Sequence, residues 1–489
     1  MNWKKAFLCT AALLAAMPLA AGKEVYADEM DENSTFTITV NNTPAGHTYA
    51  AYRVFAARAD STGTLSDIYW GEGVDPDRAI SELKADSFRY KDKFASVVNG
   101  ADAAAVISAN QADADFIREV SAVFVKCRAV KAADEDPAGN VLRLTGAGWY
   151  LTLDETDLSG QNDARSAALI FTSQETLTID PKIDLPTLEK LIIDEGTRGK
   201  TGDASVNEAL KYHLVCTLPD NYADYESYEL HFFDTSSGIR YDADSFYVSA
   251  DQELLDIQPV IDGNSMRIDI PDLKALTDKD LSGKTVLVEY KGIVTSDAVI
   301  GSEGNPNTCY ITYSNDPYGT QTGRSADEKA VFYTYKIEVV KVDEDNNPLP
   351  GASFVLRKLE AMRGSTVIEP VVSDDGTVFT FAGIGSGQYL LREVNTPDGY
   401  NTMEPIEVNI SGVHDGADGT FTLHSLTCKA GDETIEGTVA DGRIVLTAVN
   451  QKGVVLPSTG GSGTYVLYAA GIAMLIAGCL LMQRKHERE

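Results

Sequence analysis

Histidine and cysteine are the side chains of this 489-residue chain that could ligate a metal or act as nucleophiles, and their spacing excludes several kinds of chemistry. The six histidines are scattered, and the sequence contains neither a zinc motif nor a nucleophile elbow. Of the six cysteines, Cys9 and Cys479 lie in apolar terminal segments, and the other four form no CxxC pair. We therefore predict no metal, no cofactor and no enzyme of these classes.

The remaining cysteines differ in their surroundings. Cys216 and Cys309 alternate in phase with the apolar residues of their segments, so both side chains should point into the interior. A disulfide between them and a pair of buried thiols are both compatible with this pattern. Cys127 and Cys428 have no comparable partner and are expected to be unpaired.

Both ends of the chain carry patterns of processing signals rather than of fold. Two lysines precede an apolar run over 6–21, and Ala27 makes a plausible cleavage site, so residues 1–27 are predicted to be a signal peptide. At the other end, the uncharged run over 465–482 is about long enough to form a transmembrane helix. The basic tail after it should stay in the cytoplasm.

A short motif precedes the C-terminal apolar run. It fits the LPxTG sorting signal and consists of Leu456, Pro457, Ser458, Thr459 and Gly460. The order of motif, apolar span and basic tail, in a chain that opens with a leader, makes the match specific. The resemblance implies that an external cysteine enzyme, a sortase, cleaves between Thr459 and Gly460 and passes the Thr459 acyl group to an amine. The implied location is the cell wall surface, after a membrane-held precursor.

The chain is strongly acidic, with 41 Lys and Arg residues against 73 Asp and Glu residues and a net charge of -32. Nucleic acids and anionic membrane surfaces are not expected as partners, because both repel an acidic protein. The net charge favours solubility instead.

Between the two ends, short alternating runs bounded by Gly, Asn, Asp or Pro predict a mainly β protein. Examples are 36–40, 211–218, 285–290, 310–313, 335–342 and 443–448. The Ala-rich stretch over 77–130 has helical spacing and is expected to be a helical insertion packed on the first domain. The strand pattern is typical of Greek-key sandwiches.

About 430 residues are too many for one sandwich core, so three β-sandwich domains in series are expected. Prolines at 181 and 186 mark one break, and 326–330 marks another. The predicted organisation is a signal peptide over 1–27, domains over 28–180, 181–328 and 329–453, and a sorting region over 454–489.

Three motifs of the third domain, in order, resemble a Cna protein B-type domain. They are 337–343 with 349–354, 387–393 with 397–400, and 444–450. The resemblance implies an intramolecular isopeptide bond between Lys341 and Asn450. A buried lysine is more easily neutral and can attack the carboxamide, while Glu393, protonated for the same reason, would polarise the amide carbonyl.

The second domain resembles the second domain of Gram-positive fimbrial shaft proteins. The motifs that carry the resemblance are 184–190, 232–238 and 307–317. They imply a second bond between Lys190 and Asn315, promoted by the acid Asp234. Glu189, beside the lysine, should point to the opposite face of its strand.

The first domain resembles the N-terminal domain of such pilins at 46–49, 68–71 and 148–151. Its opening strand contains no lysine, and its closing strand, expected near 167–171, contains no asparagine. We therefore expect no isopeptide bond there, which would leave this domain the most labile of the three.

Family shaft proteins place their acceptor lysine between the first two domains, after a Tyr-Pro pair. Lys182 occupies this place, although Asp180 stands where tyrosine is usual, and Lys200 is the alternative amine. The resemblance thus implies the shaft subunit of a covalent pilus, with a sortase, further copies of the chain, ancillary pilins and peptidoglycan as partners. The alternative is a wall-anchored adhesin or ancillary pilin that binds host surface proteins.

Overall fold

The computed structural model describes residues 35–41, 46–59, 65–129, 134–136, 141–172, 176–194, 197–360, 364–417, 419–453 and 463–486. The predicted signal peptide and the sorting motif lie outside these residues. By their contacts, the residues form two compact units. Unit 1 is Met1–Thr334 with Val413–His424, and unit 2 is Tyr335–Gly412 with Ser425–Glu489. The predicted division of unit 1 near residue 180 stays a prediction.

The part of unit 1 that the sequence predicts as the first domain, and that keeps this name below, contains two small sheets whose side chains share one apolar cluster. Their strand orders are β5-β1-β8 and β3-β2-β6-β7, with β4 paired to β2. The strands are β1 (Thr35–Val40), β2 (Tyr49–Ala59), β3 (Leu65–Trp70), β4 (Asp134–Asp136), β5 (Val141–Thr145), β6 (Gly148–Asp154), β7 (Leu169–Thr172) and β8 (Thr176–Ile179). The last strand, β8, runs parallel to β1. The closing strand is therefore β8, after the segment expected from the sequence, and it too lacks asparagine.

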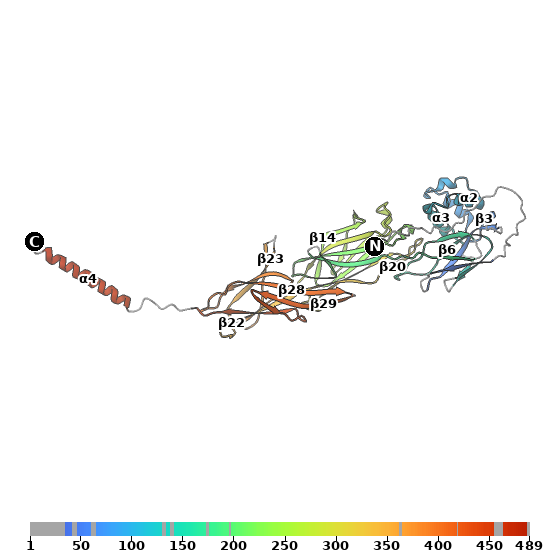
Figure 1. Cartoon of the computed structure of the whole chain (residues 1–489). Coiled ribbons are helices and arrows are strands. Elements are labelled where there is room, and N and C mark those ends of the chain that lie inside the picture. Colours follow the sequence, from blue (N-terminus) through green and yellow to red (C-terminus); the bar gives the residue numbers. More distant parts are fainter. Residues whose placement is uncertain are drawn as a thin grey trace, which may run out of the picture. The chain divides into compact units, whose positions relative to one another are not determined.

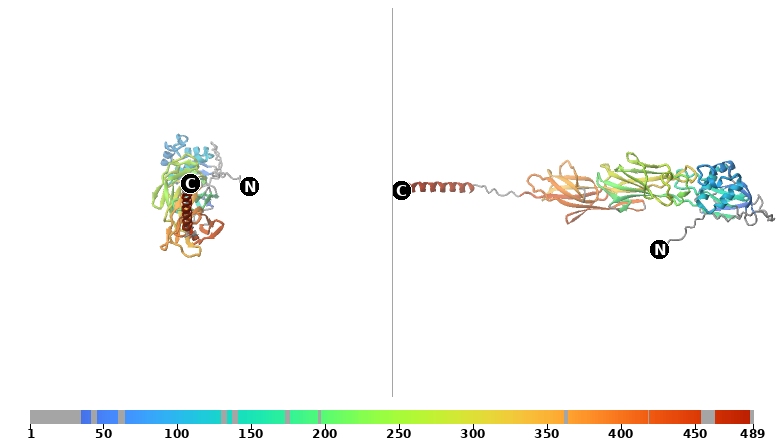
Figure 2. Two further views of the ribbon diagram at one scale, coloured as in Figure 1. Left: turned by 90° about the vertical axis from the view of Figure 1, so that its left-hand side faces the viewer. Right: turned by 90° about the horizontal axis from the view of Figure 1, so that it is seen from above.

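The predicted helical insertion is present between β3 and β4. It comprises α1 (Pro76–Leu83), the 3₁₀ helix η1 (Lys91–Phe94), α2 (Gly100–Ala109) and α3 (Ala114–Cys127). Side chains of Asp75, Asn99 and Asp113 accept backbone hydrogen bonds at the first turns of the three α-helices and so fix where they begin. Phe116 of α3 shares one buried cluster with Trp149 of β6. Figures 1 and 2 show these helices, in blue, gathered on the first domain.

The second domain is a larger sandwich of two sheets. Their orders are β10-β9-β12-β18-β14-β15 and β11-β21-β19-β13-β17-β16, with β20 paired to β19. The elements are β9 (Thr187–Asp194), β10 (Thr197–Gly199), β11 (Thr201–Asp203), β12 (Ala209–Thr217), η2 (Tyr222–Asp224), β13 (Leu230–Ser236), β14 (Ile239–Ala250), β15 (Glu253–Leu254), β16 (Val260–Asp262), β17 (Ser265–Ile270), η3 (Leu273–Ala275), β18 (Thr285–Val294), β19 (Asn305–Ser314), β20 (Thr322–Arg324) and β21 (Glu328–Tyr333). Side chains of both sheets form one buried cluster.

Two further sheets, ordered β25-β26-β22-β31 and β24-β23-β27-β28-β29-β30, belong to unit 2 except for the parts of β28 and β29 over 413–424, which belong to unit 1. The strands are β22 (Tyr335–Asp343), β23 (Ser353–Glu360), β24 (Gly364–Ile368), β25 (Val371–Val372), β26 (Val378–Ile384), β27 (Gly387–Asn395), β28 (Ile406–Ala417), β29 (Thr420–Ala430), β30 (Glu433–Glu436) and β31 (Arg443–Asn450). The first and last strands, β22 and β31, are parallel neighbours. This pairing brings the two ends of the third domain together.

The predicted mainly β fold is confirmed, and every strand run expected from the sequence overlaps an observed strand. The last element that the structure describes is α4 (Gly463–His486). In the part of the chain that the structure describes, no helix is both long enough and apolar enough to cross a membrane. The transmembrane helix expected over 465–482 is therefore not confirmed.

Candidate functional sites

The second domain buries a lysine beside an aspartate. Lys190 lies on β9 and is fully buried, whereas its neighbour Glu189 is exposed, as strand alternation requires. Lys190 Nζ donates a hydrogen bond to Oδ2 of Asp234, which lies on β13 and is also buried. A buried lysine must be paired or neutral, because an isolated charge in the interior is very costly. The structure thus brings the predicted Lys190 and Asp234 together.

Two tyrosines complete this cluster, and the sequence did not single them out. The hydroxyl of Tyr290 lies 3.1 Å from Lys190 Nζ and donates to Asp234 Oδ2 at 3.2 Å. It also accepts a 2.7 Å hydrogen bond from Nδ2 of Asn307. The hydroxyl of Tyr241 donates to Asp234 Oδ1 at 2.7 Å. Lysine, acid and carboxamide therefore meet around one phenol hydroxyl, and the carboxamide belongs to Asn307.

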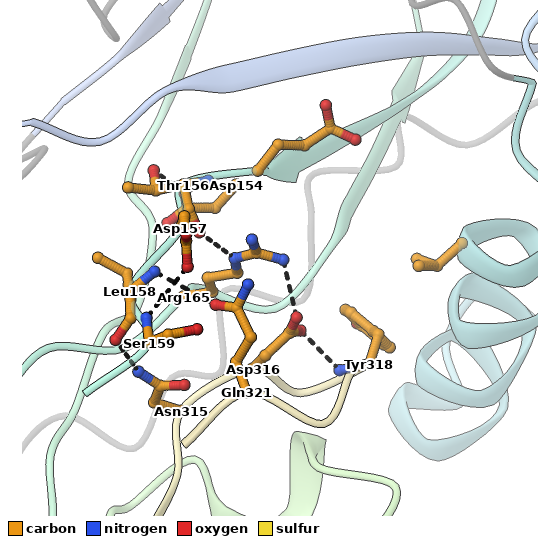
Figure 3. Close-up of polar contacts among 12 residues, drawn as sticks. Asp154, Thr156, Asp157, Leu158, Ser159, Arg165, Asn315, Asp316, Tyr318 and Gln321 are labelled. Atoms are coloured by element: carbon orange, nitrogen blue, oxygen red, sulfur yellow. Dashed lines mark hydrogen bonds and ion pairs between the residues drawn. The ribbon is translucent and has the colours of Figure 1, made fainter. Parts of the chain in front are cut away.

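Asn315, the acceptor expected from the sequence, has a different role. Its Nδ2 donates to the backbone oxygens of Leu158 at 2.9 Å and Asp163 at 3.1 Å, both in a loop of the first domain. Next to it, Arg165 of the same loop forms a 2.7 Å ion pair with Asp316 (Figure 3). These bonds make Asn315 part of the joint between the first two domains.

The strand register explains why only one of the two asparagines can meet the lysine. Asp234 pairs with Cys309 of β19. Asn307 lies two residues from Cys309, whereas Asn315 lies six residues away, which is about 20 Å along an extended strand. We therefore correct the candidate acceptor of this centre from Asn315 to Asn307.

The third domain holds a second centre of the same kind. Lys341 of β22, Glu393 of β27 and Asn450 of β31 are all buried. Nδ2 of Asn450 donates to both carboxylate oxygens of Glu393, at 3.1 and 2.9 Å, and to the Asn401 backbone oxygen at 2.8 Å. Glu393 Oε2 also accepts a 2.9 Å bond from the Met403 amide. In this centre the acid holds the carboxamide directly.

The parallel pairing of β22 and β31 positions the lysine of the third domain. Lys341 pairs with Ala448, so Asn450 lies two residues further along the neighbouring strand, on the same face. Nζ of Lys341 donates to the Val342 and Ala448 backbone oxygens, at 2.8 and 3.3 Å. Burial lowers the pKa of Lys341, and the Glu393 and Asp343 charges oppose this only in part. The neutral amine, which is the nucleophilic form, is therefore more accessible than in water.

The two candidate acceptor lysines differ in exposure. Lys182 is exposed and, among the residues that the structure describes, forms no ion pair. Its charge is one of those that oppose the rise in the pKa of Asp224 caused by burial, so it lies near η2. Lys200 is half-buried, and its Nζ is held by Glu328. Of the two, Lys182 has the amine more free to react.

The described residues offer little thiol or metal chemistry. Cys127, Cys216, Cys309 and Cys428 are all buried and free, so the pair of buried thiols, not the disulfide, is what the structure contains. Burial raises the pKa of Cys309 to about 12 and that of Cys127 to about 11, which keeps both thiols protonated and unreactive. Across the described ranges, no group of three or more His, Cys, Asp or Glu could hold a metal ion.

Two family models match the C-terminal part of the chain. Residues 335–425 match the prealbumin-like fold domain SpaA, and residues 448–489 match the LPXTG cell wall anchor motif. A curated relative, the trypsin-resistant surface T6 protein of Streptococcus pyogenes serotype M6, is 29% identical over 141 residues. This match covers 26% of this chain and 26% of the relative, about a quarter of its length.

Solved structures extend the similarity along most of the chain. The T6 backbone pilin of serotype M6 Streptococcus pyogenes, a modular three-domain structure, has a TM-score of 0.50 at 16% identity, covering 86% of this chain and 98% of that one. The major pilin SpaD of Corynebacterium diphtheriae has a TM-score of 0.48 at 14% identity, covering 87% and 99%. Residues 335–425 thus carry a prealbumin-like SpaA domain, residues 448–489 carry an LPXTG cell wall anchor, and the chain has the fold of a backbone pilin.

Proposed function

We propose that this chain is the shaft subunit of a covalent cell-surface pilus, a structural protein rather than an enzyme. The observation that carries the proposal is the presence of two fully buried lysines, Lys190 and Lys341, each grouped with a buried acid and a buried asparagine. Such groups cost stability in an ordinary core, because each buries several polar side chains. Their presence is explained if the lysine and the asparagine of each group react to form a covalent crosslink.

In each centre the neutral lysine amine attacks the asparagine Cγ, the Nζ–Cγ bond forms, the Cγ–Nδ2 bond breaks and ammonia leaves. The products are the crosslinks Lys190–Asn307 and Lys341–Asn450. Each bond joins the first and a late strand of its domain, so a pulling force passes through the crosslink instead of peeling the strands apart.

The stabilisation from one crosslink is a substantial fraction of the stability of an ordinary domain. A noncovalent domain is stable by about 5 to 15 kcal/mol. If the chain-entropy model for disulfides applies, closing a loop of about 100 residues adds about 5 kcal/mol. Two such crosslinks would suit a subunit that bears tension.

Polymerisation requires an acyl donor and an amine. We assign the donor to Thr459 of the sorting motif and the amine to Lys182, which is exposed while Lys200 is held by Glu328. The sortase would join Thr459 of one copy to Lys182 of the next and would finally attach the polymer to peptidoglycan. Ancillary pilins are expected at its ends.

The test is to express the full precursor with its sortase and to examine cell wall extracts. Lys182→Arg should abolish the ladder of covalent multimers, and the matched control Lys200→Arg should keep it. A branched peptide that joins Thr459 to Lys182 should be found by mass spectrometry in the wild type. A single wall-anchored monomer in the wild type would contradict the shaft function and favour the adhesin or ancillary-pilin alternative.

A further inference from the structure

The hydroxyl of Tyr290 lies among all three reactive groups of the second-domain centre. It is 3.1 Å from Lys190 Nζ, 2.7 Å from Asn307 Nδ2 and 3.2 Å from Asp234 Oδ2. Each of these distances is within hydrogen-bonding range. One hydroxyl therefore contacts the attacking nitrogen, the leaving nitrogen and the acid.

Packing fixes this hydroxyl in place. Tyr290 lies on β18, directly opposite Tyr212 of β12, and its ring stacks between Tyr212 at 5.2 Å and Phe246 at 5.2 Å. The residue is fully buried, and burial raises the pKa of Tyr290 well above its ordinary value. The phenol therefore stays protonated and can accept one hydrogen bond while it donates another.

Asp234 does not contact the leaving nitrogen directly, as the acid of the third domain does. Within the described part of the chain, Asp234 makes no hydrogen bond to Asn307, and both connect to Tyr290 instead. In the third domain, Glu393 contacts Nδ2 of Asn450 with both oxygens. The second centre thus needs another group to bring a proton to the leaving nitrogen.

We propose that Tyr290 is a catalytic residue that relays a proton from Lys190 Nζ to Asn307 Nδ2, an inference that rests on the proposed Lys190–Asn307 bond. Asp234 holds the proton that the lysine gives up on becoming a neutral amine. As Nζ attacks Cγ, Nδ2 loses its amide conjugation and becomes a proton acceptor, and the Tyr290 hydroxyl turns from Asp234 towards it. The Tyr290 oxygen then accepts the second Nζ proton while its own proton passes to Nδ2. The Nζ–Cγ bond forms, the Cγ–Nδ2 bond breaks, ammonia leaves, and Tyr290 ends in its starting state.

The test uses the whole mature chain, freshly translated and quenched at intervals, with linear and crosslinked peptides quantified by mass spectrometry. Tyr290→Phe removes only the hydroxyl and should slow the Lys190–Asn307 crosslink by about 100-fold or more, as loss of a general acid–base group does. The Lys341–Asn450 crosslink of the same molecules is the internal reference, and its rate should not change.

Tyr228→Phe is the matched control. Tyr228 is a fully buried tyrosine of the same core, and no described residue is a hydrogen-bond partner of its hydroxyl. This variant should form both crosslinks at the wild-type rate. Tyr241→Phe, which removes a hydroxyl that contacts Asp234 but neither reacting nitrogen, should give a smaller loss than Tyr290→Phe.

A wild-type rate of crosslinking in Tyr290→Phe would overturn the relay. Absence of the Lys190–Asn307 peptide from the wild type would instead overturn the bond on which it rests. If Tyr290→Phe does not fold, the crosslinking rates of the wild type are compared in light and heavy water. Because the relay moves two protons, heavy water should slow the second-domain crosslink more than the third-domain one. An equal slowing of both would then contradict the relay.

Discussion

The two lysine centres contain the same kinds of side chain in different arrangements. In the second domain the acid Asp234 holds the lysine, and Tyr290 connects both to the carboxamide. In the third domain the acid Glu393 holds the carboxamide of Asn450, and the lysine Lys341 donates to backbone oxygens. In one centre the acid thus contacts the lysine and in the other it contacts the carboxamide, so the proposed crosslinks would be promoted from different reactants.

The largest effects should come from removing the acids. Asp234→Asn and Glu393→Gln keep the size of each side chain but remove its carboxyl group. Each variant should lose the crosslink of its own domain and keep the other, because the acids act locally. Intact mass should then show one ammonia loss instead of two, and the affected domain should lose about 5 kcal/mol of stability.

The two acid variants also sharpen the contrast between the centres. Asp234→Asn leaves the amide contact through Tyr290 in place, whereas Glu393→Gln changes the group that touches Asn450 directly. Full crosslinking in either variant would show that its carboxyl is not needed. Peptide mapping assigns the missing crosslink to its domain.

The next largest effect should come from replacing the asparagine that reacts in the second domain. Asn307→Ala should remove one ammonia loss, and Asn315→Ala should keep both. Asn315→Ala should instead weaken the joint with the first domain by about 1 to 3 kcal/mol, because it removes a buried hydrogen bond to Leu158 and a partly buried one to Asp163. Intact mass and thermal unfolding separate these results, and loss of the crosslink in Asn315→Ala alone would restore Asn315 as the acceptor.

Sequence motifs identified most of the candidate residues but not their register. Both Asn307 and Asn315 fall in phase with the inward residues of β19, and the motif around Asn315 is the more conspicuous. Which of them meets Lys190 depends on the pairing of Asp234 with Cys309, a contact between distant segments. Strand alternation alone does not determine such a pairing.

Tyr290 was missed for a related reason. The sequence pattern of β18 predicts an ordinary core residue at this position, because the strand alternates regularly and aromatic residues are common in sandwich cores. Only the sheet order, with β18 between β12 and β14, places its hydroxyl beside Lys190. In the third domain two of the three motifs lie on the parallel neighbours β22 and β31 and the third on β27 of the other sheet, and the sequence motifs identified Lys341, Glu393 and Asn450.

The smallest effect, a dependence of stability on pH, is expected in the first domain, whose described residues include no buried lysine. His47 contacts Asp154 at 2.6 Å and Asp163 at 3.1 Å. Burial disfavours the charged imidazole, but the hydrogen bonds and charges of Asp163 and Asp154 outweigh it and raise the pKa of His47 above its ordinary 6.5. The folded state therefore binds this proton more tightly than the unfolded state does.

This His47 contribution should be complete below the ordinary pKa and should disappear as the pH rises through the raised one. Thermal unfolding of the first domain should occur at lower temperature on the alkaline side, and His47→Gln should remove that dependence. The two domains with lysine centres serve as the comparison in the same scan. A pH dependence that persists unchanged in His47→Gln would show that another group causes it.

The most direct test of the two centres is the intact mass and peptide map of the mature chain, residues 28–459, produced without a sortase. Two ammonia losses are expected, one mapped to Lys190 joined to Asn307 and one to Lys341 joined to Asn450. An unmodified mass, with both lysines in linear peptides, would contradict the proposal that these buried groups are reactants.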